Sequence, residues 1–121
     1  MADRKTALVI SAHAADFVWR CAGAIALHQE KGWDVTIACL SYGERGESAK
    51  LWKQEGMTLE KVKADRRKEA EAAAKVLGAH DIRFFDAGDY PLELDRAAKD
   101  ELVDLMRKVQ PAFMMSHSLY D

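Results

Sequence analysis

Four short apolar runs alternate with longer helix-like stretches along the chain. The runs are rich in aliphatic and β-branched side chains, which is typical of buried strands. They span residues 6–11, 34–41, 82–88 and 112–116. The stretches between them predict helices over residues 16–32, 58–78 and 96–109. This alternation of strand and helix predicts an α/β layered fold with a mostly parallel sheet.

Residues with known end preferences mark the predicted helices. Gly32 and Gly78 suit helix C-termini, whereas Thr58 and Asp95 suit N-caps. Residues 42–57 contain three glycines and no clean period, so they predict a long loop. A loop of this length in a small domain is usually functional or disordered.

The unusual polar residues fall just after the predicted strands. Ligands of open parallel sheets bind beyond the carboxyl ends of the strands. Those ends correspond to residues 11–16, 41–48, 86–90 and 116–121. We therefore expect a functional site where these four segments meet.

His13 and Asp16 lie in the first of these segments and have two interpretations. An imidazole and a carboxylate are common zinc ligands, and a turn between strand and helix can aim both at one point. Alternatively, Asp16 caps the helix that starts at Phe17, and His13 is an ordinary loop histidine.

The second segment carries the charged residues Glu44, Arg45 and Glu47. Solvated loop charges are the default interpretation. The functional alternative is that Glu47 or Glu44 acts as an acid or base while Arg45 binds a carboxylate.

Arg66 falls on the apolar stripe of the second predicted helix, so its guanidinium needs a partner. Glu69, three residues later, could supply one. Alternatively, Arg66 reaches an anionic ligand or supports the loops of the site. Turn chemistry around Gly88 accounts for Asp89, and His117 follows the last strand as a further catalytic candidate.

Composition limits the possible classes of protein. The 121 residues are 49% hydrophobic and 31% charged, with a net charge of −2, which fits one soluble α/β domain over residues 1–121. We expect no nucleic-acid or membrane partner and a cytoplasmic location. The chain stops just after a strand, so we expect it to be the N-terminal part of a longer protein. The oligomeric state stays open, a homo-oligomer included.

Four stretches together resemble the LmbE/PIG-L family of zinc-dependent de-N-acetylases. They are the His-x-x-Asp turn after the first strand, "GERGE", "RRKEAEAAAKVLGA" and "FFDAGDYPL". The resemblance implies a Rossmann-like three-layer fold with its C-terminal part missing. It also implies Zn²⁺ bound by His13 and Asp16, with a third ligand, a histidine, beyond residue 121.

Ala15 departs from this pattern, because in the deacetylases an aspartate at this position acts as the general base. Alanine cannot accept a proton. One branch of the family, the 4-oxalomesaconate hydratases, closely resembles "SAHAADFVWR", "LSYGERGESAKLW" and "HSLYD". This resemblance implies a lyase of aromatic compound catabolism that hydrates 4-oxalomesaconate to 4-carboxy-4-hydroxy-2-oxoadipate. Arg45 and Arg66 are available for such a tricarboxylate.

Two further hypotheses stay open. The first is a de-N-acetylase of an N-acetyl amino sugar or related amide, with its base relocated. The second is an inactive α/β binding fragment, since a site that lacks its third ligand should bind zinc poorly.

Overall fold

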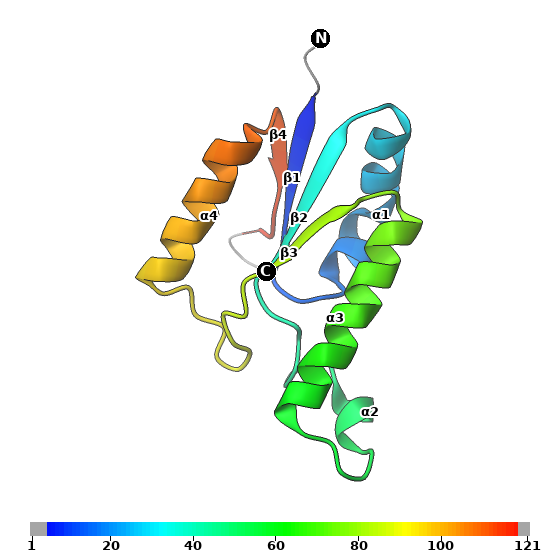
Figure 1. The fold of residues 1–121 in the computed structure, drawn as a ribbon, viewed down its shortest axis with the longest axis vertical. Coiled ribbons are helices and arrows are strands. Elements are labelled where there is room, and N and C mark those ends of the chain that lie inside the picture. The colour runs from blue at the N-terminus through cyan, green and yellow to red at the C-terminus, as the bar shows by residue number, and fades with distance from the viewer. Residues whose placement is uncertain (1–4, 119–121) are drawn as a thin grey trace.

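A four-stranded sheet forms the centre of the structure, a computed structural model that describes residues 5–118. Its strands are β1 (Thr6–Ser11), β2 (Asp34–Cys39), β3 (Asp81–Phe84) and β4 (Phe113–Met115). The order is β3-β2-β1-β4, and every neighbouring pair is parallel. The strands run downward in Figure 1, so their carboxyl ends share the lower edge of the sheet. The predicted α/β parallel fold is confirmed.

Helices cover both faces of this sheet and make three layers. Helices α1 (Asp16–Glu30) and α3 (Leu59–Val76) lie on one face, and α4 (Arg96–Val109) lies on the other (Figure 1). Alternate residues of β1 divide between the two cores, since Val9 packs with the α1 and α3 residues while Leu8 packs with Leu105 of α4. Period-two burial on both faces explains why the strands read as continuous apolar runs.

The predicted caps of two helices are present. Thr58 Oγ1 accepts a hydrogen bond from Lys61 N at 3.3 Å, at the start of α3. Asp95 Oδ1 accepts one from Ala98 N at 2.8 Å, at the start of α4. Both bonds satisfy amides that have no partner within their helix.

The segment predicted as a long loop is more ordered than expected. It contains the short helix α2 (Ala49–Trp52). Tyr42, Glu44 and Ser48 are buried in it. The strand predicted over residues 82–88 ends at Phe84, and the chain then turns through Asp86 at φ 51°. Within the described residues, no helix is long and apolar enough to cross a membrane.

Candidate metal centre

The turn after β1 holds His13 and Asp16 side by side. Asp16 Oδ2 accepts a hydrogen bond from the His13 backbone N at 2.9 Å and lies 3.2 Å from His13 Nδ1. Helix α1 begins at Asp16 itself, and Ala15 occupies the cap position without a side-chain bond. The interpretation of Asp16 as a helix cap is therefore wrong, because its carboxylate is turned back onto the preceding turn.

Glu47 adds a second carboxylate from the loop after β2. Its Oε1 lies 3.4 Å from His13 Nδ1, and the side chain is 38% exposed. His13, Asp16 and Glu47 each offer one ligand atom, and the three atoms lie within 4.8 Å of one another. Ligands at tetrahedral zinc distances are separated by about 3.3 Å. The pair His13 Nδ1 and Asp16 Oδ2, 3.2 Å apart, meets this spacing and fits a divalent ion. The third ligand that the sequence analysis expects beyond residue 121 stays a prediction.

Asp89, which the sequence assigned to turn chemistry, is part of this cluster. It lies after β3, and its side chain is only 2% exposed, with Oδ1 3.3 Å from His13 Nε2. Oδ2 accepts hydrogen bonds from Arg45 N at 2.9 Å and Gly46 N at 2.7 Å. Burial alone would raise the pKa of this carboxyl, but those two amides and His13 together lower it. The position of Asp89 just after a predicted strand was the sequence signal that could have placed it in the site.

Glu44 and Arg45 are adjacent in the chain but turn to different environments. Glu44 is 2% exposed, and its Oε1 accepts a hydrogen bond from Tyr42 N at 3.1 Å. The expectation of a solvated charge is therefore wrong for Glu44. Trp52 Nε1 donates to the carbonyl of Glu44, which fixes the loop backbone. Arg45 is exposed, and its backbone amide is the group that contacts Asp89.

Arg66 combines both roles considered for it. Its Nη1 lies 2.9 Å from Glu69 Oε2, as the structural interpretation expected. Its Nε also donates to the carbonyl of Tyr42 at 3.2 Å, and Nη2 lies 3.8 Å from Glu47 Oε2. A side chain from α3 therefore supports the loop that carries Glu47.

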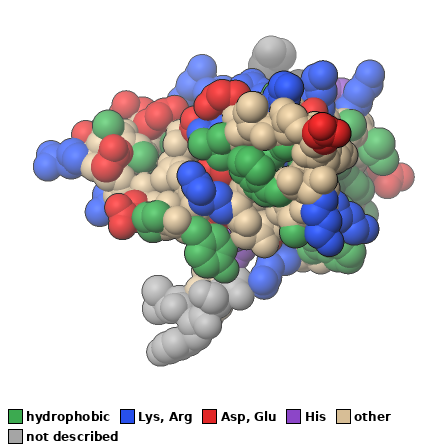
Figure 2. Space-filling view, turned by 90° about the horizontal axis from the view of Figure 1, so that it is seen from below, with side chains coloured by type: hydrophobic (Ala, Val, Ile, Leu, Met, Phe, Trp, Pro, Cys, Tyr) green, Lys and Arg blue, Asp and Glu red, His purple; other side chains and the backbone are tan. Residues whose placement is uncertain are grey.

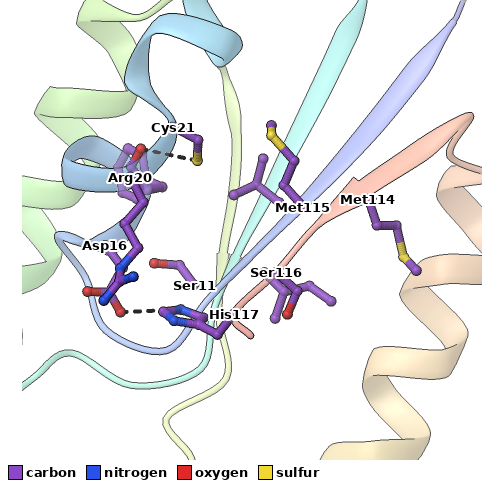
Figure 3. Close-up of a pocket in the computed structure, with 11 residues that line it drawn as sticks. Ser11, Asp16, Arg20, Cys21, Met114, Met115, Ser116 and His117 are labelled. Atoms are coloured by element: carbon purple, nitrogen blue, oxygen red, sulfur yellow. Dashed lines mark hydrogen bonds and ion pairs between the residues drawn. The ribbon is translucent and has the colours of Figure 1, made fainter. Parts of the chain in front are cut away.

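His117 approaches Asp16 from the side of β4. His117 Nε2 accepts a hydrogen bond from Ala12 N at 3.0 Å and lies 3.5 Å from Asp16 Oδ2. Figure 3 shows this contact at one end of a cavity of about 390 Å³ that also reaches Arg20 and Met115. Asp16 thus lies between two histidines. Residues 119–121 of the segment expected to contribute to the site lie outside the described residues.

Seen from the end at which the strands finish, the surface carries mixed charge. Figure 2 shows Lys and Arg side chains scattered among acidic and hydrophobic ones on this face.

Fold and site together define a Rossmann-like α/β protein with a candidate metal centre at the carboxyl edge of its sheet. The chain belongs to the PIG-L (GlcNAc-PI de-N-acetylase) family, whose sequence model matches residues 8–121.

Individual proteins of known name are also similar to the chain. The chain is 58% identical over 118 residues to the 4-oxalmesaconate hydratase of Pseudomonas putida, a match that covers 98% of this chain and 45% of the relative. The crystal structure of GalB, the 4-carboxy-2-hydroxymuconate hydratase of Pseudomonas putida, is 59% identical. It superposes with a TM-score of 0.92 over 95% of this chain and 48% of that one.

A deacetylase structure is more distant. The N,N'-diacetylchitobiose deacetylase of Pyrococcus horikoshii is 29% identical, with a TM-score of 0.80 over 93% of this chain and 40% of that one. The chain therefore spans about half the length of the relatives it matches.

Proposed function

We propose that the protein acts in a zinc-dependent hydration of 4-oxalomesaconate that yields 4-carboxy-4-hydroxy-2-oxoadipate. The observation that carries this proposal is the pairing of a metal-ligand cluster, His13, Asp16 and Glu47, with alanine at position 15. The likeness to a Pseudomonas putida hydratase, in sequence and in crystal structure, supports the same reaction class.

His13 and Asp16 are the proposed zinc ligands, and the carboxylate of Glu47 lies beside them without being assigned to the metal. When bound, zinc supplies a Lewis acid for the conjugated substrate and lowers the pKa of a coordinated water. The donors also suit other divalent ions, so the metal itself needs measurement.

Glu47 is the proposed acid/base group. Its carboxylate is partly exposed, adjoins His13 and lies near Arg66. Hydration requires the water oxygen to bond to one alkene carbon and a proton to reach its neighbour, and a carboxylate in this position can carry that proton. Glu44 is a weaker candidate for this role, because its buried carboxylate already accepts a hydrogen bond from the Tyr42 backbone amide. His117, next to Asp16, is a second candidate for proton transfer.

Arg66 and Arg45 are the proposed partners of substrate carboxylates. Arg66 adjoins Glu47, and Arg45 is exposed on the same loop. The proposed substrate is accordingly a small anionic tricarboxylate. This substrate is consistent with a role in aromatic compound catabolism in the cytoplasm.

A de-N-acetylase is the second candidate, favoured by the family and by the diacetylchitobiose deacetylase structure. Amide hydrolysis needs a base close to the metal. Ala15 provides none, so this candidate would require Glu47 or Asp89 to replace it.

The test combines metal analysis with product analysis. The wild-type protein should bind about one zinc and hydrate 4-oxalomesaconate, and His13→Ala and Asp16→Ala should each lose the zinc. Outer-shell partners alone are typically worth about 10–100-fold in metal affinity, so loss of either ligand should cost more than that. Release of acetate from N-acetylglucosamine derivatives by the wild-type protein, without hydration, would overturn the hydratase in favour of the deacetylase. Ala15→Asp should not increase hydration.

A further inference from the structure

We propose that Asp89 is a positioning residue that fixes the ring orientation and tautomer of His13, so that Nδ1 is the metal-binding atom. The inference deepens the proposed function, because it rests on the metal centre in which His13 and Asp16 are the ligands and Glu47 adjoins them.

The two nitrogens of His13 face different partners. Nδ1 lies 3.2 Å from Asp16 Oδ2 and 3.4 Å from Glu47 Oε1. Nε2 points the other way, 3.3 Å from Asp89 Oδ1. Only Nδ1 therefore faces the two other donors of the cluster.

An ionised carboxylate can only accept hydrogen bonds. A neutral imidazole carries one N–H, and the Asp89 carboxylate selects the tautomer with that proton on Nε2. The lone pair is then on Nδ1, where a metal needs it. Ligating histidines commonly donate their second ring N–H to a carboxylate in this way.

Asp89 is itself held in place. Its second oxygen accepts two backbone hydrogen bonds, from Arg45 N at 2.9 Å and Gly46 N at 2.7 Å. The side chain is 2% exposed, so water does not compete for it. One carboxylate thus ties the loop that carries Glu47 to the turn that carries His13.

Close packing supports this connection. Tyr90, next to Asp89, lies against Gly46 so tightly that any side chain at position 46 would overlap its ring. The segment after β3 therefore contacts the loop after β2 at two adjacent residues, through the Asp89 carboxylate and the Tyr90 ring.

Asp89→Asn is the test variant, because it keeps the shape of the side chain and removes the charge. The backbone amides of Arg45 and Gly46 need an acceptor, so the amide oxygen stays with them and the NH₂ group faces His13 Nε2. An NH₂ donor there no longer selects the Nε2–H tautomer. We expect zinc affinity, measured by competition with a chelating dye, to fall 10–100-fold. In zinc-loaded wild-type protein with ¹⁵N-labelled histidine, His13 should show a protonated Nε2 and a metal-shifted Nδ1, and the variant should lose this signature.

Asp86→Asn is the matched control. Asp86 lies in the same segment but is half exposed and pairs with Lys63 at 3.0 Å. It should leave zinc affinity and the His13 resonances unchanged. The spectrum of His13→Ala assigns those resonances, since only they disappear.

The possible results distinguish failure of the Asp89 role from failure of the metal centre or of the hydratase activity. If Asp89→Asn keeps wild-type zinc affinity and a protonated His13 Nε2, the positioning role is wrong. If His13→Ala binds zinc as tightly as wild type, the metal centre is wrong and the Asp89 role falls with it. If Asp89→Asn weakens zinc and alters the His13 signature while the wild type does not hydrate 4-oxalomesaconate, the hydratase fails and the Asp89 role stands.

Discussion

Gly43 lies at the point where the loop after β2 bends around the candidate metal centre. Its φ of 67° is in the left-handed region, which favours glycine. A Cβ built there would lie 3.0 Å from Glu47 Oε2 and 3.4 Å from His13 Cβ. The absence of a side chain at this residue therefore serves both the backbone and the packing of the site.

Gly43→Ala should disturb the metal centre in addition to straining the backbone. We expect a loss of about 1 kcal/mol in the free energy of unfolding, because left-handed backbone is unfavourable for alanine. Zinc affinity should also fall several-fold, because the added methyl group crowds both Glu47 and the ligand His13. Gly56→Ala is the control, since its φ is 75° but nothing lies within 4 Å of its Cβ. Urea unfolding and zinc competition measure the two effects, and equal zinc affinities would contradict the prediction.

At the scale of the elements, local signals were sufficient for α3 and α4. Thr58 and Asp95 cap the helices they were expected to cap, because an N-cap depends on a few neighbouring residues. The loop after β2 was harder to predict. The burial of Glu44 depends on contacts that only the folded loop provides, with Tyr42 N and Trp52 Nε1. The sequence pattern of that segment carries no period that reveals them.

Asp95→Ala should destabilise α4 at its first turn. The lost hydrogen bond to Ala98 N, 2.8 Å long, should cost about 1 kcal/mol of unfolding free energy. Asp100→Ala in the same helix removes only an exposed pair with Arg96 at 3.6 Å. That control should change stability by less than about 0.5 kcal/mol. Thermal unfolding compares the two variants, and an equal or larger loss for Asp100→Ala would contradict the role of the cap.

For the whole molecule, the sheet brings together segments that are far apart in the chain. The candidate site draws on residues near positions 13, 47, 66, 89 and 117, and parallel strand order places most of them at one edge. The sequence predicted this edge and the His13–Asp16 pair from the order of elements and from family resemblance. It did not predict that Asp89 contacts His13, because a carboxylate beside Gly88 is equally compatible with an ordinary turn.

Cys39 links the centre of the sheet to the global stability of the protein. It lies in β2 and is fully buried, and burial raises the pKa of its thiol from 9.0 to about 12. The unfolded chain ionises this thiol first, so stability is complete below pH 9 and is lost as the pH rises toward 12. The free energy of unfolding should therefore fall by as much as about 1.4 kcal/mol per pH unit in this range.

Urea unfolding at pH 8, 9 and 10 tests this dependence. Cys39→Ala should be less stable at every pH because a buried side chain is shortened, but its free energy of unfolding should decline less steeply than that of the wild type. Cys21→Ala, which removes the partly exposed thiol, should keep most of the steep decline. The titration of lysines and tyrosines is common to all variants. It therefore cancels in the difference between two slopes of unfolding free energy against pH. Parallel curves for wild type and Cys39→Ala would show that the thiol at the centre of the sheet does not govern the alkaline limit of the fold.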